Sequence, residues 1–297
     1  RYPLLTQQLT VLAVQLPHIY QQTLVVTWLS LVIGIKMKMD RNDRSELVVG
    51  ALCHMIGMLH ISPEVASSKE RLSGAEQNEI QRYVEKGIAA LRNIPNFPAG
   101  PLAMVAQHRE LPDGTGYPNH LEGENLGLPG QIIGISQSVY SIYKKTLSPQ
   151  GRSPRDLIPI IQINSVVYQR DVCATLLQLL REQKLPEIGL INDANIRDVI
   201  DRLLKDAAAI GACRNVVSAI VRRLQADGAQ PRVMRAEKIY AHLESILSSS
   251  GVLDPGHVAW MEQVAKLKYQ QFYREIEDLD LMIGEVRWQI RRLGQIL

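Results

Sequence analysis

The amino-acid sequence predicts an all-α protein, a helical bundle followed by a helical C-terminal extension. Apolar side chains recur at spacings of three and four residues through most of the chain, which is the periodicity of amphipathic helices. No stretch shows the alternation of apolar and polar residues that a half-buried strand requires. Apolar residues make up 46% of the 297 residues, so the helices have enough apolar surface to bury a core.

Local start and stop signals place the helices of the first half. Asp43 is the predicted N-cap of a helix running to about Leu59, and Ser73 with Glu76 predicts a capping box for the next helix. A stretch rich in glycine and proline, residues 111–130, interrupts the helices and is typical of a functional loop. The helices expected before a domain boundary near residue 185 cover residues 5–38 (as one or two helices), 43–59, 73–92, 99–110, 131–145 and 153–183.

The extension, residues 186–297, continues the helical pattern. Residues 193–248 are expected to form three short helices, and Asp254 with Pro255 predicts the start of a final helix, 254–294. Its apolar residues fit a coiled-coil seam of about four heptads, which can hold a homodimer or pack on residues 193–248 of the same chain. The seam residues are Tyr269, Phe272, Ile276, Leu279, Ile283, Val286, Ile290, Leu293 and Leu297.

Charge and cysteine content limit the function classes. The net charge of +3 gives no strong electrostatic case for nucleic acid. The three cysteines are far apart and lack zinc-binding spacing, so reduced thiols in a cytoplasmic protein are expected. The most apolar run, Leu24–Ile35, is about half the ~20 residues of a spanning helix, so no membrane segment is expected.

Two segments carry the chemical information. The first, Leu52–Ile61, reads LCHMIGMLHI, and the second, His108–Pro118, reads HRELPDGTGYP. They resemble the HDIGK motif and the HHE and DGSGYP motifs of the HD-GYP cyclic di-GMP phosphodiesterases. The resemblance covers roughly residues 18–185 and implies an HD-type helical bundle. The related noncatalytic HDOD group would leave the DGTGYP segment unexplained.

The resemblance implies a degenerate metal site. That family hydrolyses a phosphodiester with two or three metal ions, which activate water and neutralise developing charge. Only His54 and His108 keep the family's residue type, whereas Met55 replaces the bridging aspartate and Arg109 adds a fixed positive charge. We therefore expect no catalytic residue, no bound metal and no other cofactor. The ligand positions fall on Gln22, His54, Met55, Tyr83, His108, Arg109 and Gln137.

The second motif also contains the family's signature loop. Its glycines permit positive φ, so the loop can be a stable turn and nothing more. In the family, this loop is associated with contacts to diguanylate cyclase domains, so a docking surface is the alternative. Likewise His54 and His108 can be ordinary core histidines, and Arg109 and Glu110 solvated charges at a helix end. The loop positions are Asp113, Gly114, Gly116, Tyr117 and Pro118.

The resemblance implies a noncatalytic signalling or scaffold protein in bacterial cyclic di-GMP signalling, acting through protein contacts. The expected partner is a diguanylate cyclase domain or, through the C-terminal helix, a second copy of the chain. The alternatives are a cyclic di-GMP receptor without hydrolysis and a metal-dependent phosphodiesterase with an altered site. Met58 and Gln131 stand where the family has a phosphate-binding lysine and arginine, which weakens the receptor alternative.

Overall fold

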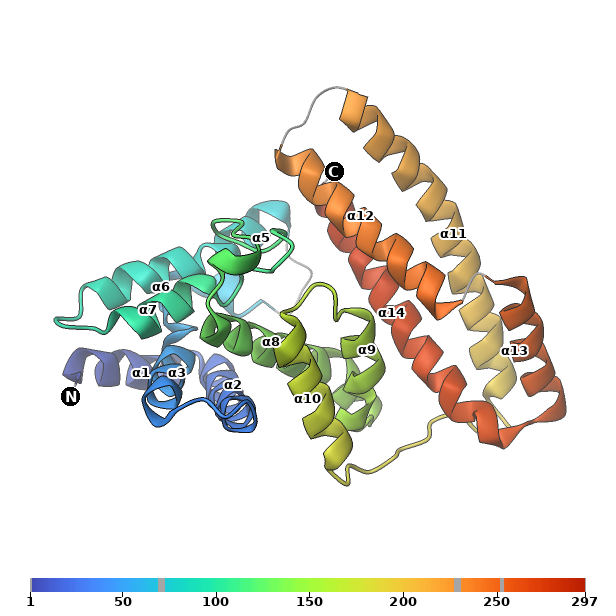
Figure 1. The fold of residues 1–297 in the computed structure, drawn as a ribbon, viewed down its shortest axis with the longest axis horizontal. Coiled ribbons are helices and arrows are strands. Elements are labelled where there is room, and N and C mark those ends of the chain that lie inside the picture. Colours follow the sequence, from blue (N-terminus) through green and yellow to red (C-terminus); the bar gives the residue numbers. More distant parts are fainter. Residues whose placement is uncertain (1, 69–72, 227–230, 252–253, 297) are drawn as a thin grey trace. The chain divides into compact units, whose positions relative to one another are not determined.

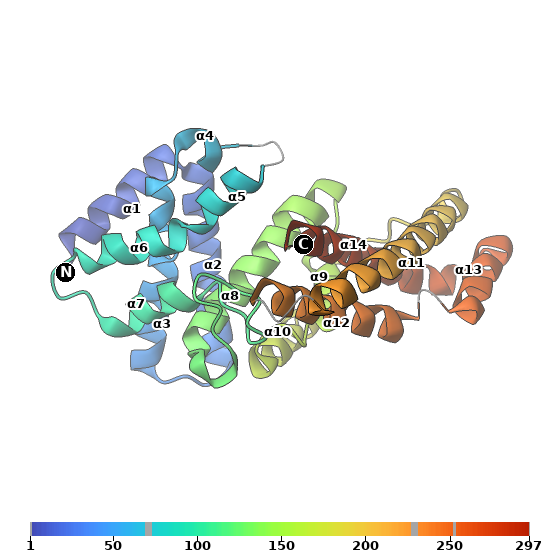
Figure 2. The ribbon, with the colours of Figure 1, turned by 90° about the horizontal axis from the view of Figure 1, so that it is seen from above.

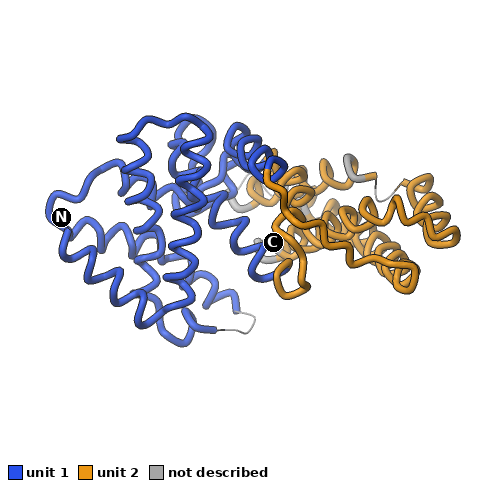
Figure 3. Tube along the Cα trace, turned by 90° about the horizontal axis from the view of Figure 1, so that it is seen from below, with its two compact units in different colours: residues 1–146, 167–182 blue, residues 147–166, 183–297 orange. Residues whose placement is uncertain are grey.

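The computed structural model describes residues 2–68, 73–226, 231–251 and 254–296, which form α-helices joined by loops, with no β-strand among them (Figures 1 and 2). The predicted all-α class is confirmed. An isolated β-bridge pairs Asp113 with Glu122. The chain divides into two compact units: residues 1–146 with 167–182, and residues 147–166 with 183–297 (Figure 3).

The first unit is a helical bundle in which α2 contacts α1, α3, α8 and α10. Residues of α2 spaced three or four apart, such as Ile19, Thr23 and Val26, are buried, as the helical period requires. The α-helices of the unit are α1 (Pro3–Gln15), α2 (Pro17–Lys36), α3 (Arg41–Cys53), α4 (Pro63–Ala66), α5 (Gly74–Gln81), α6 (Tyr83–Arg92), α7 (Ala99–Gln107), α8 (Leu128–Ile142) and α10 (Arg170–Glu182).

Helix starts follow local chemistry, with one correction. The capping box of Ser73 and Glu76 is present at the start of α5. The prediction that Asp43 caps α3 is wrong, because Asp40 is the N-cap and its Oδ1 accepts a hydrogen bond from the Asp43 N–H at 2.9 Å. Asp43 instead lies in the first turn, where its negative charge favours the helix dipole. Pro17 begins α2, so residues 5–38 form two helices.

By length and composition alone, α2 is apolar enough to cross a membrane, which differs from the expectation drawn from Leu24–Ile35. A third of the apolar window is buried inside the structure, and the core helix of a globular bundle meets the same criterion. Its outward side nevertheless carries exposed apolar residues, of which Trp28 is the most exposed.

The second unit is built on four helices, α11 (Ile196–Ala226), α12 (Pro231–Ser250), α13 (Pro255–Leu267) and α14 (Tyr273–Ile296), which share one apolar core. Two long helices therefore replace the three short ones predicted for residues 193–248. The predicted final helix is also divided, because the chain turns at Lys268, whose φ is +51°. The break lets α13 and α14 each bury an apolar face in the same core.

The short helix α9 (Leu157–Ile163) belongs to the second unit, although the sequence predicted residues 1–185 as one domain. It contacts α14, and Ile163 packs on the core of the second unit. The chain then returns to the first unit as α10. This interleaving depends on contacts between distant residues, which the local sequence pattern does not reveal.

Candidate functional site

The two motif segments meet inside the first unit. His54 is the C-cap of α3 and His108 is the C-cap of α7. Their rings lie edge to face with centroids 5.3 Å apart. Both side chains are almost completely buried. The resemblance in sequence therefore corresponds to a real cluster in space, formed where helices that contact each other end (Figure 1).

Hydrogen bonds to the backbone fix the protonation of both rings. Nδ1 of His54 donates to the Ala51 carbonyl at 2.6 Å, and Nδ1 of His108 donates to the Val105 carbonyl at 2.7 Å. A carbonyl oxygen only accepts, so each neutral ring carries its hydrogen on Nδ1 and a lone pair on Nε2. The Tyr83 hydroxyl donates to Nε2 of His108 at 2.7 Å. Nε2 of His54 is buried and has no hydrogen-bond partner.

Burial keeps the site neutral apart from one cation. Desolvation lowers the pKa of His54 to about 4, although its bond to Ala51 opposes the shift. Desolvation also lowers the pKa of His108 well below the ordinary value, and His54 and Arg109 lower it further. The pKa of the Tyr83 hydroxyl is raised, again chiefly by burial. Both imidazoles and the phenol are therefore uncharged near neutral pH.

Arg109 ties the cluster to the signature loop. Its Nε donates to the Tyr117 hydroxyl at 2.9 Å, and its Nη1 donates to Oε1 of Gln137 at 3.3 Å. Gln137 in turn donates from Nε2 to the Met55 sulfur at 3.2 Å and to the Tyr83 hydroxyl at 3.5 Å. These bonds connect α6, α8 and the segments that follow α3 and α7. The interpretation of Arg109 as a solvated helix-end charge is therefore wrong.

The signature loop is held by buried Glu110, which the sequence did not single out as a site residue. One carboxylate oxygen accepts from the Asn119 N–H at 2.6 Å, and the other accepts from the Leu121 N–H at 3.0 Å. Glu110 is only 1% exposed, so its interpretation as a solvated charge is also wrong. A loop with little secondary structure needs acceptors for its backbone N–H groups, and that requirement is the signal that could have identified it.

The two loop glycines serve different purposes. Gly114 has φ of +74°, as predicted. Gly116 does not adopt the positive φ that a glycine permits; a Cβ there would lie 2.3 Å from the Leu111 nitrogen, so the close backbone contact requires the glycine. The Asp113 side chain completes the turn by accepting from the Thr115 N–H at 2.9 Å and hydroxyl at 2.7 Å. The peptide bond between Tyr117 and Pro118 is cis.

Six of the seven predicted ligand positions come together, and Gln22 does not join them. Gln22 is half-buried on α2 and, in the described part of the chain, makes no hydrogen bond to this cluster. Met58 is buried in the same apolar cluster as Met55 and Tyr83. Gln131 is buried on α8 and donates to the Glu110 carbonyl at 3.3 Å. Neither side chain brings a positive charge to the site.

The donor set does not fit the divalent ions that the family uses. Hard divalent cations need several carboxylate and imidazole ligands that converge. In the described part of the chain, no group of three or more His, Cys, Asp or Glu side chains could hold a metal ion. The cluster instead offers two imidazoles and a thioether beside a guanidinium.

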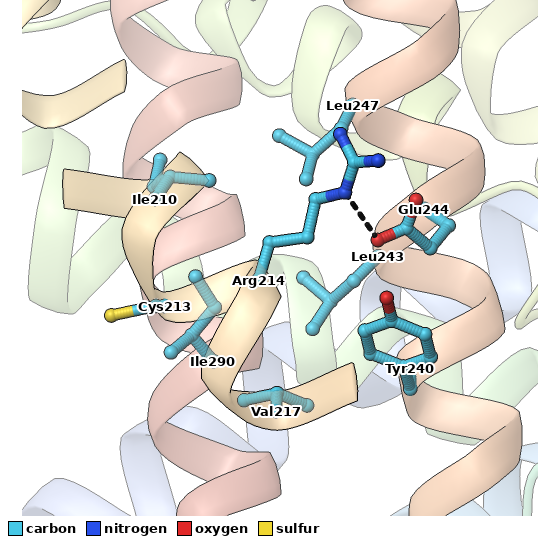
Figure 4. Close-up of a pocket in the computed structure, with 9 residues that line it drawn as sticks. All are labelled: Ile210, Cys213, Arg214, Val217, Tyr240, Leu243, Glu244, Leu247 and Ile290. Atoms are coloured by element: carbon cyan, nitrogen blue, oxygen red, sulfur yellow. Dashed lines mark ion pairs between the residues drawn. The ribbon is translucent and has the colours of Figure 1, made fainter. Parts of the chain in front are cut away.

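The second unit contains a small pocket (Figure 4). It lies among α11, α12 and α14, and the ion pair of Arg214 with Glu244, 3.1 Å apart, spans it. Its volume allows about one water molecule. The pocket lacks room for an organic ligand, so the cluster of the first unit is the better candidate site.

Comparison with known proteins agrees with the motifs. Residues 7–169 match the HD domain family model. The chain is 28% identical over 177 residues to the cyclic di-GMP phosphodiesterase PdeB of Borreliella burgdorferi, covering 58% of this chain and 46% of that protein. It is 26% identical over 145 residues to the 3'3'-cGAMP-specific phosphodiesterase 1 of Vibrio cholerae, covering 48% of this chain and 31% of that protein.

A solved structure, the HDG"Y"P protein Bd1817 of Bdellovibrio bacteriovorus, is 17% identical with a TM-score of 0.46, covering 54% of this chain and 51% of that one. This chain spans less than half the length of the two phosphodiesterases. The family match covers more than half of the present chain and includes both motif segments. The chain therefore belongs to the HD domain family.

Proposed function

We propose that this chain is a noncatalytic signalling or scaffold protein, related to cyclic di-GMP phosphodiesterases, that acts through protein contacts. The observation that carries the proposal is the continuous hydrogen-bond network that joins His108, Tyr83, Gln137 and Arg109. The guanidinium of Arg109 lies where metal ligands are expected from the motif, and its charge opposes the binding of divalent cations.

The signature loop supports a role in protein contact. Its inner part is buried and its backbone is held by Glu110, whereas residues 119, 120 and 122–125 are exposed. A surface segment with a fixed backbone loses little conformational entropy on binding, which favours recognition. We propose that this exposed segment docks a partner, for which a diguanylate cyclase domain is the candidate that the resemblance suggests.

The test of catalysis is an assay of cyclic di-GMP hydrolysis by the purified full chain with added Mn²⁺ or Fe²⁺. We expect no turnover and no stoichiometric divalent metal by elemental analysis, because the bridging carboxylate is absent. Turnover that a chelator abolishes would establish the alternative of an enzyme with an altered site. Cyclic di-GMP binding without turnover would establish the receptor alternative.

The test of docking is a binding measurement with a diguanylate cyclase domain. Glu124 lies in the exposed part of the loop and Glu64 lies on α4 away from it in sequence; both side chains are exposed. We expect Glu124→Arg to weaken the interaction and the control Glu64→Arg to leave it unchanged. Equal affinity of both variants and the wild-type chain would place the contact elsewhere.

A further inference from the structure

One side of α2 packs in the core of the first unit, whereas the opposite side is exposed and apolar. Val26 and Ile33 are on the buried side. On the other side, Leu24 is 43% exposed, Trp28 one turn later is 64% exposed, and Ile35 two turns further on is 51% exposed. Large apolar side chains that are exposed singly are ordinary, but a contiguous row of them marks an interaction surface.

The spacing of this row is the same in both directions along the helix. Its members are separated by four, three and four residues, and they are Leu24, Trp28, half-buried Leu31 and Ile35. An antiparallel second copy of α2, related by a two-fold axis at the middle of the row, would place Leu24 of one copy against Ile35 of the other. The same arrangement places each Trp28 ring against the smaller Leu31, whereas a parallel pair would place the two Trp28 rings against each other. The row is therefore complementary to its own antiparallel copy.

The charges around this face favour a second copy over a lipid surface. Residues 17–35 contain no Asp, Glu, Lys or Arg, so two copies of the face meet without like-charge repulsion. A helix that lies on a membrane normally carries Lys and Arg beside its apolar face, which bind anionic headgroups. Here Lys36 is paired with Glu182 at 2.7 Å, and Arg41 and Arg44 each follow an aspartate in the sequence. The flank of the face therefore offers little net positive charge to anionic lipid.

We propose that the exposed face of α2 is a homodimer interface, in which the helices of two copies pack antiparallel across a two-fold axis. The face consists of Leu24, Val25, Trp28, Leu31 and Ile35. The exposed fractions of its four exposed residues together equal about two whole side chains, on the order of 400 Å² per copy. With the flanking side chains, two copies would bury on the order of 1,000 Å² in total, which is the size of a weak, reversible interface. The dimer therefore dissociates on dilution.

The first experiment is sedimentation velocity of the full chain over a series of concentrations. We expect a reversible equilibrium of monomer and dimer. Trp28→Glu should weaken the dimer at least tenfold, because it places two carboxylates in the interface, and it should leave the melting temperature unchanged, because Trp28 is exposed in the monomer. Trp288→Glu is the matched control, since Trp288 is 49% exposed on α14, and it should leave the dimer unchanged. Thermal unfolding of both variants checks that the fold is retained.

The second experiment tests the antiparallel arrangement by oxidative cross-linking. Both cysteine variants also carry Cys213→Ser, because Cys213 is exposed whereas Cys53 and Cys173 are buried. We expect a mixture of the Leu24→Cys and Ile35→Cys chains to form a disulfide-linked dimer. Each variant alone should not cross-link, because equivalent positions of antiparallel helices lie roughly 16 Å apart along the axis. Cross-linking of each variant with itself would contradict the antiparallel arrangement.

Three other results would overturn the interface. A wild-type chain that is monomeric at every concentration rules it out, and a dimer that persists in Trp28→Glu but is lost in Trp288→Glu assigns the contact to the second unit. A monomeric chain that sediments with vesicles of phosphatidylcholine and phosphatidylglycerol, unless Trp28 is replaced by Glu, assigns the face to a membrane. The hydrolysis assay and the diguanylate cyclase binding measurement do not involve α2, so the proposed function and the dimer can fail separately.

Discussion

At the scale of single residues, His54 and His108 show how burial decides charge. Each ring has one hydrogen bond that favours protonation, yet desolvation dominates and lowers both pKa values. Arg109 keeps its charge because the Tyr117 hydroxyl and the Gln137 amide oxygen accept from it. The cluster therefore contains one satisfied cation beside two neutral imidazoles.

Stability should depend on pH through His54. Its folded pKa of about 4 lies below the ordinary 6.5, so between these values the unfolded chain binds a proton that the folded chain does not. The contribution of His54 to the free energy of unfolding is fully present well above pH 6.5. It is lost progressively as the pH drops toward 4, and the loss is roughly 2 kcal/mol at pH 5. Thermal unfolding at pH 7 and pH 5 should show a smaller decrease for His54→Gln than for the wild type. His60→Gln, at an exposed position, is the control and should keep the wild-type decrease.

Gly57 permits a close backbone contact that the motif alone does not explain. A Cβ at this position would lie 1.8 Å from the Tyr83 carbonyl oxygen and 2.6 Å from the Gly87 nitrogen. Gly57→Ala should therefore separate residues 56–60 from α6 and cost about 1–3 kcal/mol or more. Gly74→Ala is the control, since its Cβ meets nothing within 4 Å and should change stability by less than about 0.5 kcal/mol. Denaturant unfolding of both variants measures the difference.

At the scale of secondary-structure elements, the apolar seam of α14 packs against other helices of the same chain. Ile276, Leu279, Ile283, Val286 and Leu293 are buried in the core of the second unit. Ile290 and Phe272 are partly buried against it, Tyr269 is exposed before the helix begins, and Leu297 lies outside the described residues. The intramolecular alternative is therefore the one that the structure adopts, and a homodimer through this face stays a prediction.

The variant Ile283→Asp tests whether the seam packs within the chain or between two copies of it. A carboxylate in this core has no partner, so we expect a clear loss of thermal stability with no change in molecular mass. Val216→Asp is a suitable control, because Val216 lies on α11 of the same unit and is exposed. Conversion of a wild-type dimer to a folded monomer, seen by light scattering, would instead favour the intersubunit seam.

Glu277, a charged residue beside the apolar seam of α14, is buried rather than solvated. It is 1% exposed, and one oxygen accepts from the N–H groups of Leu190 and Ile191. Its other oxygen pairs with Arg274 at 3.2 Å and with buried Arg152 at 3.9 Å. The carboxylate thus joins three segments of the second unit.

Removing this carboxylate should be costly, because it leaves the N–H groups of Leu190 and Ile191 without their acceptor and takes one of three carboxylates away from buried Arg152. We expect Glu277→Ala to lower the free energy of unfolding by about 2 kcal/mol or more, since each buried N–H group left unsatisfied costs about 1–3 kcal/mol. Glu275→Ala, an exposed position two residues earlier on α14, should change it by less than about 0.5 kcal/mol. Urea unfolding of both variants gives the comparison, and similar midpoints would contradict the proposed importance of the network.

At the scale of the whole molecule, the two units are interleaved along the chain, since residues 147–166 belong to the second unit and residues 167–182 to the first. A fragment ending at residue 185 would therefore keep α9 without the helix α14 that it contacts. We expect fragment 1–185 to expose the apolar residues of α9 and to aggregate or bind a hydrophobic dye more strongly than the full chain. A monomeric fragment with no added dye binding would show that residue 185 is a true domain boundary.

The sequence by itself determined the helical class and the identity of the motif residues. Both depend on short stretches of chain: the apolar period is local, and a capping box such as that of Ser73 and Glu76 spans four residues. Six of the seven ligand positions could be predicted as one cluster, because the two motif segments contain His54, Met55, His108 and Arg109 and the resemblance of the helices beyond them assigns Tyr83 and Gln137. The hydrogen bonds and charge of each residue in the cluster could not be predicted from the sequence.

Only the tertiary structure shows which side chains are hydrogen-bond and ion-pair partners. Tyr83 is hydrogen-bonded to His108, which is 25 residues away in the sequence, and Gln137 is hydrogen-bonded to Met55, which is 82 residues away. Glu110 and Glu277 look like ordinary surface charges in sequence, yet distant backbone N–H groups and arginines make their burial favourable. Periodicity and capping are properties of neighbouring residues, whereas the charge and bonding of a buried group depend on segments that only folding brings together.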